Sequence, residues 1–259
     1  MKPILSFFLY IFPFLLFSQN SVIVEYVQIS ETRYMKSNTK SILYANNDMA
    51  KQSHFKPQLN QEYEHGASMN ENGEISIIEK PEESDINWFI NPNKNEILKS
   101  VTKGNIQQIV YDSNLKYDWK ITDEVDNIGN YQVIKAMTHF RGRTFIAWFA
   151  PSIPIGFGPW KLYGLPGLIL RMYDEDKKFT WIVRKININV ELPKSDLSPV
   201  IQNDATKMTY EEALEISRKQ RNEKAKIRNT KLGGRGNSFK TVHHREENLE
   251  RKYEWEKEN

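Results

Sequence analysis

The chain has 259 residues, no cysteine and a formal net charge of +3 at pH 7. This length allows a sizeable apolar core, and the lack of cysteine excludes a disulfide framework. The core must therefore stabilise the fold. The small net charge excludes a protein that is strongly basic or acidic throughout, so an anionic partner is expected to meet only a local basic segment.

The first 18 residues predict a secretory signal peptide. Lys2 provides a positive start, residues 4–17 form an apolar run, and Ser18 marks the expected cleavage site. The run is shorter than the roughly 20 residues that a membrane-spanning helix needs. We therefore expect a soluble mature chain that is periplasmic or secreted after cleavage.

Short strands between polar loops are expected in the first part of the mature chain. Residues 21–29 alternate with the period of a strand. The polar span 30–73 predicts loops with brief strands and a helical turn at 48–55. Further strands are expected at 75–78, 88–90 and 97–101, with a tight turn at Asn72-Gly73 and a hairpin loop at 91–95.

A more regular pattern begins near residue 107. Apolar segments alternate with short turn clusters, which typically join antiparallel neighbours. The fold class predicted is mainly β, with one large curved antiparallel meander sheet that resembles a half-barrel and has a concave apolar face. The segments that carry this prediction are 109–111, 117–121, 131–137, 145–148, 168–173 and 179–188.

The last part of the chain predicts a C-terminal helix and a charged, mobile tail. Thr209 and Glu212 form a capping-box pattern before a helix expected at 210–228. The domain organisation expected is a signal peptide at 1–18, a β domain at 19–203, and a basic helix and tail at 204–259.

Ten Lys or Arg residues lie between 218 and 245, against Glu223 alone. This basic run is a candidate contact for an anionic membrane surface, and a solvated basic helix is the alternative. Nucleic acid is not an expected partner in the envelope.

Residues 129–169 resemble the core of the secreted GLPGLI family of Bacteroidota envelope proteins. The resemblance rests on Phe140-Arg141-Gly142-Arg143, on Gly158-Pro159-Trp160-Lys161 and on the hexapeptide at 164–169. It implies an exported location, and family members are often encoded near outer-membrane TonB-dependent receptors. It implies no particular activity. The C-terminal residues 253–259 depart from the family's usual ending.

The hexapeptide has a structural and a binding interpretation. Pro166 and Gly167 suit a type II turn, while Gly164 allows close approach of neighbouring groups. The alternative is a stiff loop that borders a site for a ligand or partner protein. Its candidate binding residues are Trp148, Phe157, Trp160, Tyr163, Leu165 and Arg143.

Evidence for catalysis is weak in the sequence. The histidines lack metal-ligand spacing, and no nucleophile elbow or phosphate-binding loop is present. A hydrolase acting on peptide or glycan would need Asp123, Glu124, His139 and Asp174 to form a cluster. We therefore expect no catalytic residue, metal or cofactor.

The function expected is that of a non-enzymatic periplasmic binding or assembly factor that holds an apolar or amphipathic ligand. The alternatives are a protein-interaction accessory of an outer-membrane TonB-dependent receptor and, less favoured, a hydrolase.

Overall fold

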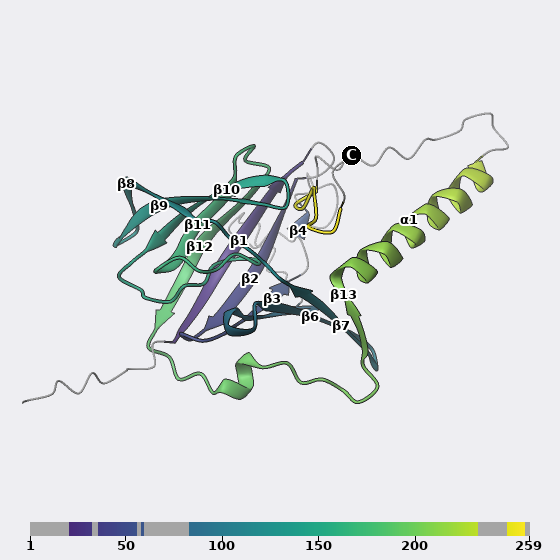
Figure 1. Ribbon diagram of the computed structural model, residues 1–259, viewed down its shortest axis with the longest axis horizontal. Helices are drawn as coiled ribbons and strands as arrows, with labels where there is room; N and C mark the ends of the chain where they lie inside the picture. Colours follow the sequence, from purple (N-terminus) through teal and green to yellow (C-terminus); the bar gives the residue numbers. More distant parts are fainter. Residues whose placement is uncertain (1–20, 33–35, 56–57, 60–82, 233–247, 257–259) are drawn as a thin grey trace, which may run out of the picture.

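The structure is a computed structural model that describes residues 21–32, 36–55, 58–59, 83–232 and 248–256. It is mainly β, as expected, with the described strands in one open sheet and one α-helix after them (Figure 1). The elements are β1 (Val22–Glu31), β2 (Lys36–Ala45), β3 (Ala50–Phe55), β4 (Gln58–Leu59), β5 (Glu83–Asn91), η1 (Pro92–Lys94), β6 (Glu96–Lys103), β7 (Ile106–Ser113), β8 (Lys120–Ile128), β9 (Tyr131–Phe140), β10 (Arg143–Ala150), β11 (Leu168–Asp174), β12 (Phe179–Ile188), η2 (Lys194–Leu197), β13 (Thr206–Thr209) and α1 (Tyr210–Leu232).

The sheet consists of two antiparallel meanders rather than the single one expected. Its strand order is β13-β7-β6-β5-β3-β2-β1-β12-β11-β10-β9-β8, with β4 paired to β2. The strands from β1 to β7 run outward from the middle, and the strands from β8 to β12 return from the opposite edge. β12 pairs with β1 because β2 occupies only one edge of that strand. The short β13 adds a parallel pair with β7.

Local differences from the predicted elements have clear causes. The expected helical turn at 48–55 is strand β3, because the Asn46 side chain accepts hydrogen bonds from the backbone of Asp48 and Met49 and turns the chain back onto β2. The span 30–73 also contains the ten-residue β2. The strand expected at 75–78 and the turn at Asn72-Gly73 lie outside the described residues.

The helix and its capping box are confirmed. The Thr209 hydroxyl and backbone N–H both bond to the Glu212 carboxylate, and the Glu212 N–H donates to the Thr209 hydroxyl at 3.2 Å. Helix α1 begins at Tyr210, directly after Thr209. It projects from the sheet, and its first turns lie against the other described elements (Figure 1).

Residues 248–256, called the strap, dock on the sheet instead of forming a mobile tail. The backbone N–H groups of Arg251 and Lys252 donate to the Arg141 carbonyl at 2.8 and 3.1 Å. The rings of Tyr253 and Trp255 stack 5.0 Å apart, and both lie near the Tyr210 ring. These aromatic contacts explain why a segment with so many charges packs against the fold.

Candidate functional site

The concave face of the sheet is filled by the protein's own chain. Residues 151–167, called the filling loop, connect β10 to β11 and enter the core. The Trp160 ring packs within 5.4 to 6.1 Å of the rings of Phe140, Phe145 and Trp181. The expected apolar groove is therefore occupied by side chains.

Most of the binding residues expected from the sequence are part of this packing. Phe157, Trp160, Tyr163 and Leu165 lie on the filling loop and are at most 8% exposed. Trp148 is equally buried, and its ring lies 5.1 Å from the Arg171 guanidinium. Their assignment to ligand binding stays a prediction, and the geometry favours a packing role.

The hexapeptide is a corner of the core, but it is not the expected type II turn. That turn requires a positive φ at Gly167, whereas the positive φ of +95° belongs to Gly164. At Gly167, an added Cβ would lie 2.3 Å from the Ala150 carbonyl oxygen. Gly167 is therefore needed for close backbone approach, and Pro166 leads the chain into this contact.

Polar side chains fix the filling loop in place. The Tyr117 hydroxyl donates to the Lys161 carbonyl at 2.8 Å, and Trp119 Nε1 donates to the Tyr163 carbonyl at 2.9 Å. The first two bonds satisfy carbonyl groups that a buried loop would otherwise leave unpaired. Just after the loop, the Tyr26 hydroxyl donates to the carbonyl of Ile169 in β11 at 2.7 Å.

A buried group of charged side chains lies where the filling loop meets the strap. We call it the ionic cluster, and its members are Asp112, Arg141, Lys161 and Glu250. Lys161 Nζ lies 2.6 Å from the Asp112 carboxylate and 2.8 Å from that of Glu250. Arg141 contacts the same two carboxylates, each at 2.7 Å, so that every charge in the ionic cluster has an opposite partner.

The ionic cluster shifts the pKa of both of its acids downward. Burial opposes ionisation of Asp112, but Lys161 and Arg141 outweigh it and hold the pKa of this carboxyl below its ordinary value. The pKa of Glu250 is lowered against the same opposing effect of burial. Burial and the nearby Glu250 carboxylate raise the pKa of Tyr210, whose hydroxyl donates to that carboxylate. Both acids therefore stay ionised at neutral pH.

Aromatic rings surround the two cations of the ionic cluster. Lys161 Nζ lies 4.0 Å from the centre of the Tyr210 ring and 5.0 Å from that of Trp88. The Arg141 guanidinium lies 5.4 Å from the Tyr253 ring and 5.6 Å from the Trp255 ring, both on the strap. Cation–π attraction adds to the ion pairs here because these sites are desolvated.

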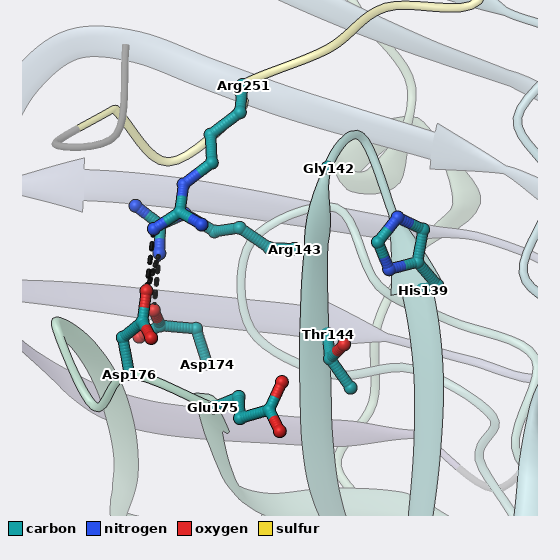
Figure 2. A pocket seen from close by; sticks show the side chains of 8 residues that line it. All are labelled: His139, Gly142, Arg143, Thr144, Asp174, Glu175, Asp176 and Arg251. Carbon is teal, nitrogen blue, oxygen red and sulfur yellow. Dashed lines mark hydrogen bonds and ion pairs between the residues drawn. The ribbon is translucent and has the colours of Figure 1, made fainter. Parts of the chain in front are cut away.

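A cavity of about 240 Å³ lies beside the strap, at the tips of the β9–β10 and β11–β12 hairpins (Figure 2). We call it the polar cavity. Two ion pairs form one wall, Arg143 with Asp174 at 2.5 Å and Arg251 with Asp176 at 2.6 Å. The complete lining is His139, Gly142, Arg143, Thr144, Asp174, Glu175, Asp176 and Arg251.

Three lining side chains of the polar cavity make no hydrogen bond or ion pair to another described side chain: His139, Thr144 and Glu175. They supply an imidazole, a hydroxyl and a carboxylate. Such groups can exchange hydrogen bonds with a polar ligand. Arg143, expected as a binding residue, belongs to this cavity, although its guanidinium is already bonded to Asp174 and to the Asn248 carbonyl.

The proposed hydrolase cluster is not assembled in this structure. His139 and Asp174 line the same cavity, but Asp174 is held by Arg143 and by the Phe179 N–H. Asp123 and Glu124 are exposed on the edge strand β8. Within the described ranges, no group of three or more His, Asp or Glu residues could hold a metal ion.

Sequence reasoning missed the ionic cluster. Its members are far apart in the chain, and Arg141 enters the sequence analysis only through the motif Phe140-Arg141-Gly142-Arg143. One local signal was available, because Lys161 interrupts the otherwise aromatic and apolar run from Phe157 to Leu165. A charge inside such a run points to a buried cation with a partner.

Comparison with known proteins matches a short central part of the chain to a family. A family model described as a protein of unknown function (Porph_ging) matches residues 139–171. The match suggests a Bacteroidota envelope family and overlaps the stretch that resembles the GLPGLI family, without identifying that family itself. None of the curated proteins matches the chain. No helix in the described ranges has the length and apolarity needed to cross a bilayer.

The fold is similar to part of a solved structure, that of PNGF-II. In the P21 space group the TM-score is 0.50 with 18% identity, over 76% of this chain and 32% of the PNGF-II chain. In the C2 space group the TM-score is 0.47 with 18% identity, over 73% and 31%. The chain thus spans about a third of the length of PNGF-II. The likeness in the P21 space group shows the fold alone.

Proposed function

We propose that the protein is a non-enzymatic binding or assembly factor of the cell envelope. It contacts its partner at the end of the molecule where the strap, the polar cavity and the start of α1 lie. The observation that carries this proposal is the filled concave face, together with the open polar cavity at the charged end. The expected ligand is therefore polar or charged rather than apolar.

The helix α1 supports a role in contact with another macromolecule. Arg218, Lys219, Arg221 and Lys224 are exposed on the part of the helix that projects from the sheet (Figure 1). A helix that is polar on all sides typically bridges to another body or stays in solvent. Its positive charge would speed encounter with an acidic partner. Following the resemblance in sequence, the partner proposed is an envelope protein such as a TonB-dependent receptor.

Photo-cross-linking in cells tests this proposal. A cross-linking amino acid is placed at His139 in the polar cavity, at Lys219 on α1, or at Ile188 as a control. Ile188 is 40% exposed and lies at the opposite end of β12 from the polar cavity. We expect the first two positions, and not the third, to recover the same envelope protein. Recovery of no envelope protein, or equal recovery from all three positions, would reject the proposal.

The basic charge of α1 favours a second candidate, attachment to an anionic membrane surface. Flotation with vesicles that contain anionic lipid tests it directly. Under this candidate, binding falls steeply as salt is raised from low to physiological concentration, because screening weakens surface electrostatics. Charge-neutral vesicles are the control. Failure to float with anionic vesicles at low salt would exclude this candidate.

A further inference from the structure

The sheet and its loops supply an incomplete ionic cluster. They contribute two cations, Arg141 and Lys161, whose side chains are each 1% exposed, and one acid, Asp112, at 2%. The strap supplies the second buried acid, Glu250, and the Glu254 carboxylate at its rim lies 3.1 Å from Arg141 Nε. Without Glu250, the two cations would share Asp112 as their one buried acid, which is unfavourable. The surface that the strap covers is therefore a site that requires a carboxylate from another segment.

We propose that this site is a recognition site for an acidic segment of the partner protein, and that Glu250 occupies it as an internal competitor. This inference rests on the proposed function and names the chemistry of the partner. The strap shows which ligand features fit. One is a glutamate between Lys161 and Arg141, and another is the pair of backbone N–H groups after it, at Arg251 and Lys252, which donate to the Arg141 carbonyl.

The contacts around Glu250 define the ligand further. Two positions before it, the Asn248 carbonyl accepts hydrogen bonds from Arg143 at 2.7 and 2.9 Å. Three and five positions after it, Tyr253 and Trp255 lie against the Arg141 guanidinium. The site thus fits an acidic segment with aromatic residues shortly after its glutamate and a turn between them and its end.

The chemistry of the contact suits an exchangeable ligand. Buried ion pairs add little net stability compared with apolar packing, but they select strongly for the correct charge. The strap also touches α1, where Arg218 lies 3.1 Å from the Glu256 carboxylate. An acidic partner attracted by α1 would meet this site next to it. Charge complementarity therefore favours an acidic protein segment as the incoming ligand.

A competitor within the same chain has a higher effective concentration than a free peptide at ordinary assay concentrations. A free peptide with the sequence of the strap should therefore bind the wild-type chain weakly. Weakening the strap should expose the site. The variant for this purpose is Glu250→Gln, which removes the charge while keeping the size of the side chain.

The experiment measures anisotropy of a labelled synthetic peptide of residues 248–256 with the full-length chain. A second peptide carries glutamine at the position of Glu250. We expect the Glu250→Gln chain to bind the first peptide at least ten-fold more tightly than the wild type does, and to prefer it at least ten-fold over the second. The variant Glu211→Gln, which changes an exposed carboxylate on α1, should behave as the wild type. A folded Glu250→Gln chain that binds neither peptide, or both equally, overturns the proposal.

Two further measurements cover the remaining outcomes. If Glu250→Gln does not fold alone, refolding with the first peptide should restore its cooperative thermal transition, and no recovery overturns the proposal. Cross-linking from Lys219 in cells should recover more partner with Glu250→Gln than with the wild type. An unchanged yield overturns this inference while leaving the proposed function in place. A gain in binding to anionic vesicles without a gain in peptide binding also overturns it.

Discussion

Replacing Lys161 with methionine tests whether the ionic cluster is a linked unit. The Lys161 side chain is fully buried, with ion pairs of 2.6 and 2.8 Å and a ring centre 4.0 Å from its Nζ. Methionine preserves most of the apolar volume but leaves two acids with Arg141 as their only cation in the cluster. Removing one partner of a buried ion pair costs about 3–5 kcal/mol. We expect a loss at the lower end, about 3 kcal/mol, because Arg141 still contacts both carboxylates.

Chemical denaturation in urea measures this change, and a double-mutant cycle with Glu250→Gln measures the coupling. If the cluster is linked, the double variant should lose about 1–3 kcal/mol less than the sum of the single losses. The residues outside the cluster are unchanged in all four proteins, so packing losses cancel to first order. A loss below about 1 kcal/mol for Lys161→Met, or additive effects within about 0.5 kcal/mol, would refute the reasoning.

Three other predictions concern the rest of the core. Gly167→Ala should lower stability by about 1–3 kcal/mol in urea unfolding, because its Cβ would lie 2.3 Å from the Ala150 carbonyl oxygen; an unchanged midpoint contradicts this. Trp119→Phe should lower the free energy of unfolding by about 1 kcal/mol, because it removes the hydrogen bond to the filling loop. A variant at exposed Ile121 is the control, and destabilisation by that variant alone would argue against this reasoning. Burial, with Lys99 nearby, lowers the pKa of His54 from 6.5 to about 4. The unfolded chain therefore binds a proton first, so stability falls as pH drops from about 6.5 to 4, and His54→Gln should remove this part of the slope in thermal melts.

The strands could be predicted because their evidence is local. The alternation from Val22 to Tyr26 and the turn chemistry around Asn95 and Gly129 act within a few residues. The order of strands in the sheet depends instead on which edge of β1 stays open after β2 has paired. No short pattern records that choice, so the two meanders were taken for one.

The candidate site was less predictable because its contacts join distant parts of the chain. The aromatic residues of the filling loop have the composition of either a core or a ligand groove, and only the folded chain shows that they fill the concave face. In the sequence, Glu250 is one of many charged residues in the C-terminal segment, and no local pattern distinguishes it from the others. Its importance follows from the two cations it meets, and those lie 89 and 109 residues earlier.

The pairing of β1 with β12 also constrains how the chain reaches its native state. Val22 pairs with Ile188, so the two halves of the sheet can join only after most of the chain is available. Pairings between such distant segments close large loops and are slow to form. Glu250 lies later still, so the ionic cluster is completed only after residue 250 has been made. A chain cut before Glu250 would keep Arg141 and Lys161 with Asp112 as their one buried acid, and this unbalanced charge would distinguish the truncated molecule from one that carries the strap.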